Sequence, residues 1–212
     1  MSELRDYEEW HRAYDVPGSD LTWRLRLVQD YLRTALDERS GPLRVLSVCS
    51  GDGRDLVEVL ADRGDAERVT ATLLELHPTI AQHARDRAEN VGLTGIEVRT
   101  VDAGDTDSYR DALPADVVLL VGIFGNITDA DVQATIMAAP SLCAPGATLL
   151  WSRGRHENDR NDLVRGWFAE AGFVELDYAT REEGSRPALG AMRYDGEPVP
   201  CEPGRRLFTF VR

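Results

Sequence analysis

The sequence predicts an α/β fold in which a mostly parallel sheet is covered by helices on both faces. From about residue 43 onward, short apolar runs alternate with stretches of helical periodicity, a pattern typical of parallel strands joined by helices. Near the C-terminus, two strand-like stretches, residues 173–180 and 205–212, have no helical pattern between them. Because a parallel return needs a crossover of about a dozen residues, usually helical, we expect these two stretches to pair antiparallel and close the sheet.

The first 40 residues predict two helices. Apolar and aromatic side chains at residues 4, 7, 10 and 14 are spaced three and four apart, so they line one face of a short helix. A second helix is expected over about residues 20–38, with Ser19 or Asp20 as its N-cap and Gly41 and Pro42 beyond its end. We predict that residues 1–40 form a helical lid or extension on a main domain of residues 41–212.

Strands and helices alternate along the main domain. Strands are expected at about residues 44–49, 69–76, 96–101, 116–122 and 147–152. Helices are expected between and after them, at about residues 54–62, 78–91, 106–112, 129–142 and 161–171. The stretch of residues 182–204 is rich in Gly and Pro and long for a hairpin loop, so we expect it to cover a substrate.

Length, charge and cysteine content narrow the class of protein. A chain of 212 residues with 42% hydrophobic residues fits one globular domain. Its formal net charge of −13 repels phosphate backbones, so we expect no nucleic-acid partner. Cys49, Cys143 and Cys201 are odd in number and far apart, which favours reduced thiols over disulfides or a zinc site. No cluster has metal-ligand spacing, so no metal is expected.

The first ten residues, MSELRDYEEW, are acidic and polar, and so lack the basic start and apolar run of a secretion signal. No stretch approaches the roughly 20 apolar residues that a membrane-spanning helix requires. We therefore expect a cytoplasmic protein with no membrane partner.

The stretch VLSVCSGDGRDLVEVL, residues 45–60, places Gly51 and Gly53 between a strand and a helix. Such a turn lies at the carboxyl edge of a parallel sheet, where ligands bind, and glycine allows positive φ and close approach to the backbone. Glu75 ends the next strand 22 residues after Gly53, near the spacing of about 20 at which an acidic side chain meets a ribose. Asp102 ends the third strand, where it would face an adenine amino group. These residues fit either a dinucleotide or S-adenosylmethionine.

Charge at the helix entrance favours S-adenosylmethionine. Asp52 and Asp55 lie where the pyrophosphate of NAD would rest. A carboxylate within about 4 to 6 Å would repel that group, whereas S-adenosylmethionine brings a sulfonium and an ammonium. The third glycine of the dinucleotide motif is also missing, since Leu56 takes its place. An NAD(P)-dependent oxidoreductase and a non-catalytic S-adenosylmethionine-binding module stay open as alternatives.

Four segments together resemble the signature segments of class I S-adenosylmethionine-dependent methyltransferases, in particular small bacterial ones: VLSVCSGDGRD, LLELHP, VDAGD and ADVVLLVGIFGNI. The resemblance covers about residues 43–212 and implies a Rossmann-like, seven-stranded, mostly parallel sheet. Ser47 and Cys49 depart from the family, which usually has an acidic residue and a glycine at these positions. The resemblance implies S-adenosyl-L-methionine as cofactor, bound by Cys49, Ser50, Gly51, Asp52 and Gly53 in the turn, Glu75 at the ribose, Asp102 and Ala103 at the adenine, and also by Leu76 and Gly122.

The methyl acceptor is expected beside the fourth strand, because Asn126 lies in the segment that is next to the donor's sulfonium in the resembled family. If a general base takes part, histidine is the usual choice because its pKa lies near neutrality. His156 follows the fifth strand and His11 belongs to the predicted lid. We therefore take His156, His11 and Asn126 as candidate catalytic residues for in-line methyl transfer to a small-molecule acceptor. Arg153 and Arg155 either hold an anionic group of that acceptor or pair with surface carboxylates.

Overall fold

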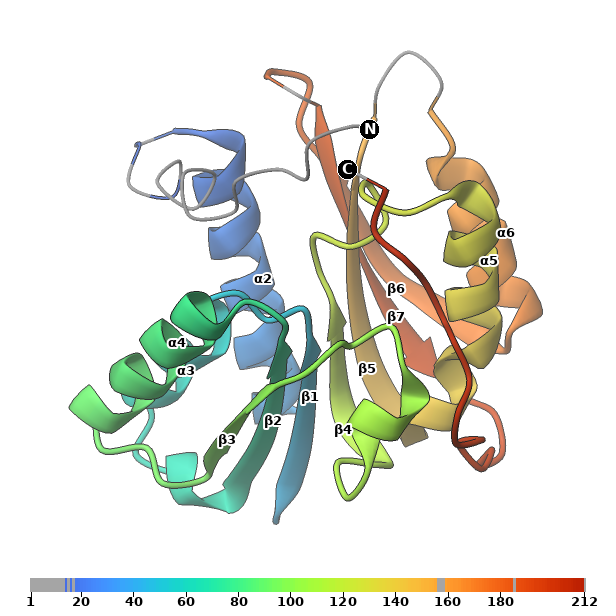
Figure 1. The fold of residues 1–212 in the computed structure, drawn as a ribbon. Helices are drawn as coiled ribbons and strands as arrows, with labels where there is room; N and C mark the ends of the chain where they lie inside the picture. The colour runs from blue at the N-terminus through green and yellow to red at the C-terminus, as the bar shows by residue number, and fades with distance from the viewer. Residues whose placement is uncertain (1–13, 15, 17, 156–158, 185, 212) are drawn as a thin grey trace.

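The computed structural model describes residues 14, 16, 18–155, 159–184 and 186–211, which form a seven-stranded sheet flanked by helices (Figure 1). The strands are β1 (Leu43–Val48), β2 (Val69–Glu75), β3 (Ile96–Thr100), β4 (Ala115–Leu120), β5 (Cys143–Gly154), β6 (Phe173–Thr180) and β7 (Pro187–Tyr194). The α-helices are α2 (Asp20–Asp37), α3 (Arg54–Ala61), α4 (Pro78–Asn90), α5 (Asp129–Ala138) and α6 (Asn161–Glu170). Short 3-10 helices are η2 (Ala66–Arg68), η3 (Thr106–Tyr109) and η4 (Ala139–Leu142).

The strand order is β3-β2-β1-β4-β5-β7-β6. The first five strands pair in parallel, and β7 pairs antiparallel with both β5 and β6. This confirms the predicted mostly parallel sheet with an antiparallel closing pair. The chain builds outward from β1 to β3 and then returns to place β4 on the other side of β1. Connections therefore leave β1 and β4 on opposite faces, which opens a crevice at their carboxyl ends.

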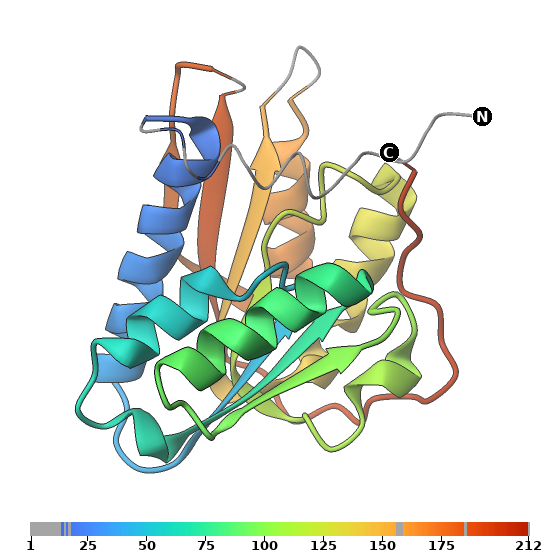
Figure 2. The same cartoon turned by 60° about the vertical axis from the view of Figure 1, so that its left-hand side comes forward.

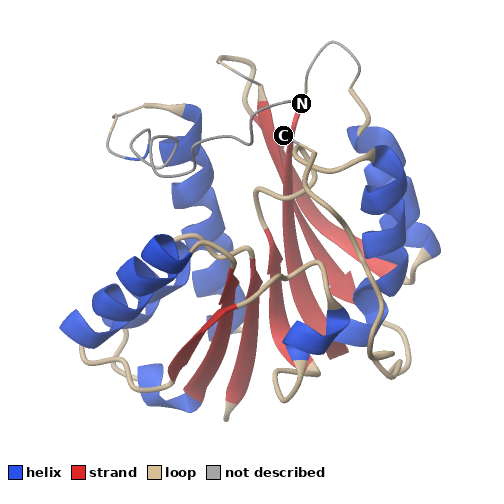
Figure 3. Ribbon diagram, in the orientation of Figure 1, coloured by secondary structure: helices blue, strands red, loops and turns tan. Residues whose placement is uncertain are grey.

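Helices cover both faces of the sheet (Figures 2 and 3). On one face, α2 and α3 bury Val28 and Leu56 in the same cluster as Val45 of β1. On the other face, Leu46 of β1 joins a cluster that holds Phe168 of α6 together with side chains of α5. Val45 and Leu46 are neighbours in the chain and point to opposite faces, as strand geometry requires. The near-continuous apolar character of β1 follows from this burial on both sides.

Helix α2 begins and ends close to the predicted bounds. The Ser19 side chain accepts a hydrogen bond from the backbone N–H of Thr22 and caps the helix. Val28, Leu32 and Leu36 are buried against the sheet and α3.

Among the residues that the structure describes, no helix is both long and apolar enough to cross a bilayer.

The closing strand pair differs from the prediction in one member. The partner of β6 is β7, residues 187–194, which lies inside the stretch expected to be a loop, and residues 205–212 were wrongly expected as that partner. Most of β7 is buried between its neighbours, and it consists largely of small residues such as Ala188, Gly190 and Ala191. A Cβ at Gly190 would overlap the Trp151 indole. Because this packing requires small side chains, β7 lacks the β-branched residues by which a strand is usually predicted.

The predicted helix over residues 106–112 was also wrong, because only the 3-10 helix η3 forms there. Beside it runs an extended stretch, residues 205–211, which we call the C-terminal segment (Figure 1). The backbone N–H of Thr106 donates to the carbonyl of Arg205 at 2.9 Å, and that of Leu207 to the carbonyl of Gly104 at 2.8 Å. Leu207 and Phe208 are buried. The C-terminal segment therefore helps to cover the face of the sheet that a longer helix would otherwise cover.

Candidate functional site

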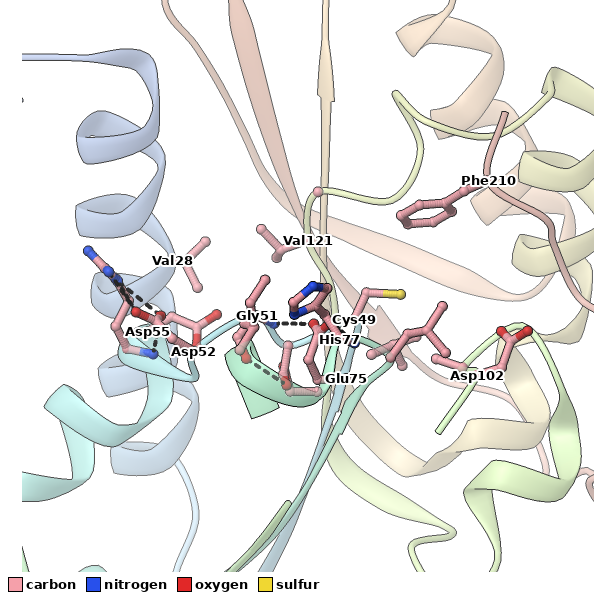
Figure 4. A pocket seen from close by; sticks show the side chains of 18 of the residues that line it. Val28, Cys49, Gly51, Asp52, Asp55, Glu75, His77, Asp102, Val121 and Phe210 are labelled. Carbon is pink, nitrogen blue, oxygen red and sulfur yellow. Dashed lines mark hydrogen bonds and ion pairs between the residues drawn. The ribbon is translucent and has the colours of Figure 1, made fainter. Parts of the chain in front are cut away.

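A cavity of about 610 Å³ lies at the carboxyl edge of the sheet, where β1 and β4 part (Figure 4). The turn after β1 and the ends of β2 and β3 contribute to its lining, together with α2 and the C-terminal segment. The predicted cofactor residues come together here. Those that line the cavity are Cys49, Ser50, Gly51, Asp52, Glu75, Leu76, Asp102, Ala103 and Gly122, while Gly53 is the N-cap of α3.

The turn after β1 is a tight elbow. Cys49, Gly51 and Gly53 all have positive φ, at 53°, 59° and 67°. At Gly53 a Cβ would lie 2.6 Å from the Leu73 side chain, so both conformation and space require glycine there. Cys49 adopts the left-handed region despite its side chain, which is uncommon outside glycine, Asn and Asp. The elbow thus brings backbone groups and the start of α3 to the cavity.

Glu75 is fixed by two backbone donors. The N–H of Gly51 donates to Oε2 at 2.9 Å, and the N–H of His77 donates to Oε1 at 2.8 Å (Figure 4). Burial raises the pKa of Glu75, while these N–H groups act in the opposite direction. Each carboxylate oxygen keeps a further lone pair. A pair of neighbouring hydroxyls in the cavity can therefore donate to both oxygens.

Asp52 and Asp55 differ in their partners. The Asp52 carboxylate is buried and forms ion pairs with Arg54 at 2.6 Å and Arg87 at 2.9 Å. Asp55 accepts the backbone N–H of Leu56 at 2.8 Å, and none of the described residues forms an ion pair with it. Burial raises the pKa of Asp55 to about 6. Asp55, rather than Asp52, is thus the carboxylate whose charge is left for a cationic ligand.

A guanidinium lies on the same side of the cavity as Asp55. Arg24 of α2 lines the cavity, and its Nη2 donates to the Tyr14 hydroxyl at 2.7 Å. Its positive charge acts to lower the pKa of Asp55, which places the two groups within electrostatic reach. This part of the cavity therefore offers both signs of charge.

Asp102 and the C-terminal segment form the opposite end of the cavity. Oδ1 of Asp102 accepts the N–H of Gly104, and Oδ2 pairs with the guanidinium of Arg206, both at 2.8 Å. Leu76, 64% exposed, is a large apolar side chain on the cavity wall. Phe210 also lines it (Figure 4). A flat, partly polar ring fits between these apolar and polar groups.

Of the three candidate catalytic residues, Asn126 is the one that the structure describes, and it is not among the described residues that line the cavity. Asn126 holds the turn after β4, because its Nδ2 donates to the Gly122 carbonyl at 2.7 Å, and Ser152 accepts the Gly122 N–H at 2.9 Å. Arg153 pairs with Asp129 and Arg155 with Glu182, as the surface alternative predicted. His11 and His156 lie outside the described residues.

Among the cavity residues that sequence reasoning missed are Arg24, Arg206 and Phe208. Arg24 lies in a helix that contains other arginines, so the local sequence does not show which of them faces the cavity. Arg206 and Phe208 belong to a stretch taken for a sheet strand, and their place follows only from tertiary contacts.

Comparison with known proteins gives the fold. No protein-family model and no curated protein matches the sequence. Magnesium protoporphyrin IX methyltransferase from Synechocystis PCC 6803, solved with bound SAM, matches with a TM-score of 0.69 at 14% identity, over 88% of this chain and 90% of that chain. An O-methyltransferase family protein from Burkholderia thailandensis matches with 0.61 at 21%, over 82% of this chain and 58% of that chain.

A structure described as a putative tRNA (m1A22) methyltransferase from Streptococcus pneumoniae also matches, with a TM-score of 0.53 at 20% identity, over 83% of this chain and 71% of that chain. These likenesses show that the chain has the fold of class I methyltransferases. The proteins named differ in acceptor, so the shared fold does not select one.

Proposed function

We propose that this protein is an S-adenosylmethionine-dependent methyltransferase that acts in the cytoplasm on a small-molecule acceptor. The observation that carries the proposal is the order of polar groups along the cavity. Asp55 and Arg24 suit the ammonium and carboxylate of an amino acid, Glu75 suits a sugar diol, and Asp102 suits the amino group of a base. That order matches the parts of the donor from one end to the other. Structures of similar fold that contain SAM and SAH support it.

Asp55 argues against a dinucleotide. A pyrophosphate on the elbow would rest at the N-terminus of α3, beside this carboxylate. Two unit charges of like sign about 5 Å apart repel by roughly 3 kcal/mol at an effective dielectric of 20. The ammonium of an amino acid would be attracted instead. An NAD(P)-dependent oxidoreductase therefore stays the weaker candidate.

Bound S-adenosylmethionine supplies an electrophilic methyl group on a sulfonium. The chain's own contribution is to hold donor and acceptor in line, which can supply much of the rate. Asn126 acts as a positioning residue in this proposal, because it fixes Gly122 at the cavity wall. Burial raises the pKa of the Cys49 thiol, so this side chain stays protonated and lines the donor site without acting as a base. His156 and His11 stay candidates for a general base.

A small acceptor suits the walls and the charge of the protein. Leu25, Val28, Val121 and Phe210 give the cavity an apolar side, and the net charge of −13 disfavours nucleic acid. Helix α2 contributes to this wall, so we propose that residues 1–40 together act as the lid over the acceptor. The free thiols of Cys49, Cys143 and Cys201 fit a reducing compartment.

The test is a binding series by isothermal titration calorimetry on the unmodified protein. S-Adenosylhomocysteine is expected to bind with micromolar or better affinity, 5′-methylthioadenosine more weakly because it lacks the amino acid, and NAD⁺ not measurably. Stronger binding of NAD⁺ than of S-adenosylhomocysteine would refute the proposal. A panel of small acceptors with methyl-labelled donor then distinguishes an enzyme from a binding module, since only the enzyme transfers label.

A further inference from the structure

The C-terminal segment is fixed to the loop after β3 by several contacts. The backbone N–H of Arg205 donates to the Thr106 hydroxyl, and the N–H of Thr106 returns a bond to the Arg205 carbonyl, both at 2.9 Å. Asp105 and Arg206 form an isolated antiparallel bridge. The N–H of Val211 donates to the Asn126 carbonyl at 2.8 Å. The segment therefore has a defined position at the cavity.

Gly104 permits a close approach between the loop after β3 and the C-terminal segment. A Cβ on Gly104 would overlap the Phe208 carbonyl and would lie 3.1 Å from Oδ1 of Asp102 and 3.2 Å from Cζ of Arg206. Only glycine leaves room for the carbonyl, the carboxylate and the guanidinium at one point. The glycine of the VDAGD segment is therefore needed for the C-terminal segment to pack against this loop.

Arg206 and Gly104 together orient the Asp102 carboxylate. One oxygen receives the Gly104 N–H and the other receives Nη1 of Arg206. Nε of Arg206 donates to the Thr209 hydroxyl at 3.3 Å, which ties the guanidinium to its own segment. Because each oxygen accepts one of these hydrogen bonds, the carboxylate cannot rotate freely. The two donors therefore fix the direction in which its remaining lone pairs can accept from a ligand.

The Asp102–Arg206 pair adds little to stability by itself. The two side chains are 44% and 50% exposed, and exposed ion pairs contribute about 0 to 1 kcal/mol. Both residues line the cavity. Because the ion pair contributes little to stability and faces the cavity, its main effect should be on a bound ligand.

We propose that Arg206 is a positioning residue for base recognition, holding the Asp102 carboxylate so that it accepts the exocyclic amino group of adenine and rejects a 6-oxo purine. This rests on the proposed function, since it takes the donor's base to lie at Asp102. A carboxylate accepts from an amino group but repels an oxo group, which has no proton to give. The preference is lost if the carboxylate is free to turn away.

The test compares two product analogues, S-adenosylhomocysteine and S-inosylhomocysteine, by calorimetry. The unmodified protein is expected to prefer the adenosyl compound by about tenfold or more, the range in which one hydrogen bond to a charged group discriminates. Arg206→Gln should reduce this preference to about threefold or less, mainly by weakening the adenosyl compound. Arg206→Lys keeps a cation for the single Nη1 contact and should restore most of the preference.

Arg205→Gln is the matched control. Its side chain pairs with Glu202 at 3.1 Å and is 55% exposed, so the preference should stay as in the unmodified protein. An equal loss of affinity for both compounds in Arg206→Gln, or an unchanged preference, overturns the inference. Equal binding of the two compounds by the unmodified protein overturns it as well but leaves the proposed function standing. Failure to bind S-adenosylhomocysteine at all refutes the proposed function.

Discussion

Glu75→Gln is the substitution that most directly tests the ribose contact. The carboxylate accepts N–H groups from Gly51 and His77, and a ligand diol would donate to both oxygens. Glutamine has one acceptor oxygen, so its amide nitrogen must face one of these backbone donors and can no longer accept one ligand hydroxyl. A hydrogen bond to a charged group contributes about 1.5 to 3 kcal/mol. S-Adenosylhomocysteine should therefore bind about 10 to 150 times more weakly.

Stability should fall by a smaller amount in the same variant. One of the two backbone N–H groups would lose its acceptor, which costs about 1 to 3 kcal/mol for a buried group, and the contacts from Gly51 and His77 are only part-buried and exposed. Burial raises the pKa of Glu75, which means that ionised Glu75 already carries a desolvation cost that neutral glutamine avoids. The loss should lie near the lower end of that range, about 2 to 4 °C in melting temperature for a chain of this size.

Calorimetry and thermal melting of matched proteins measure both effects. Glu89→Gln serves as the control, because Glu89 is exposed on α4 and should change neither affinity nor melting temperature. Affinity for S-adenosylhomocysteine within threefold of the unmodified protein in Glu75→Gln would refute the placement of the sugar. A large loss in Glu89→Gln would show that any reduction of negative charge weakens binding.

Three further predictions concern charge, backbone and packing. Asp55→Asn should remove the pH dependence of S-adenosylhomocysteine binding below neutrality. In the unmodified protein the affinity for S-adenosylhomocysteine should fall about tenfold from pH 7 to 5. The reason is that the Asp55 pKa is about 6, and only about a tenth of a carboxyl is ionised one unit below its pKa. Equal pH profiles of binding in the unmodified protein and in Asp55→Asn would contradict this. Gly53→Ala should cost about 2 to 4 kcal/mol in unfolding free energy, from positive φ and overlap with Leu73, whereas Gly64→Ala, with open space, should cost less than about 1. Phe208→Ala should cost about 3 to 5 kcal/mol, because the ring is buried; a loss below about 1 kcal/mol would show that the C-terminal segment is not part of the core.

The parallel half of the fold could be predicted because its strands are continuous apolar runs, whereas its helices carry apolar residues at helical spacing. β1 is apolar on both faces and α4 begins with Pro78 at its first position, and both signals are local. The observed bounds of these elements lie within one or two residues of those expected.

β7 could not be predicted for a physical reason. Gly190 must be small because the Trp151 indole lies against it, and that neighbour is about forty residues away in the sequence. The stretch RRLFTFVR, residues 205–212, is strand-like in sequence, yet in its described part the only bridge is the isolated one between Arg206 and Asp105, and no sheet pair forms. Its role depends on contacts that no local pattern records.

The same division holds for the site. Gly51, Gly53 and Glu75 could be placed from spacing, since a strand, a turn and a helix fix their relative positions. The different roles of Asp52 and Asp55 could not be predicted, because within the described residues Arg54 and Arg87 pair with Asp52 and not with Asp55.

A crystal structure of the protein with S-adenosylhomocysteine tests the central claim most directly. We predict both ribose hydroxyls within about 2.5 to 3.0 Å of the Glu75 carboxylate oxygens, the ammonium beside Asp55 and the base between Leu76 and the C-terminal segment. A nucleoside bound with its sugar away from Glu75, or density for it elsewhere with this cavity empty, would contradict the account.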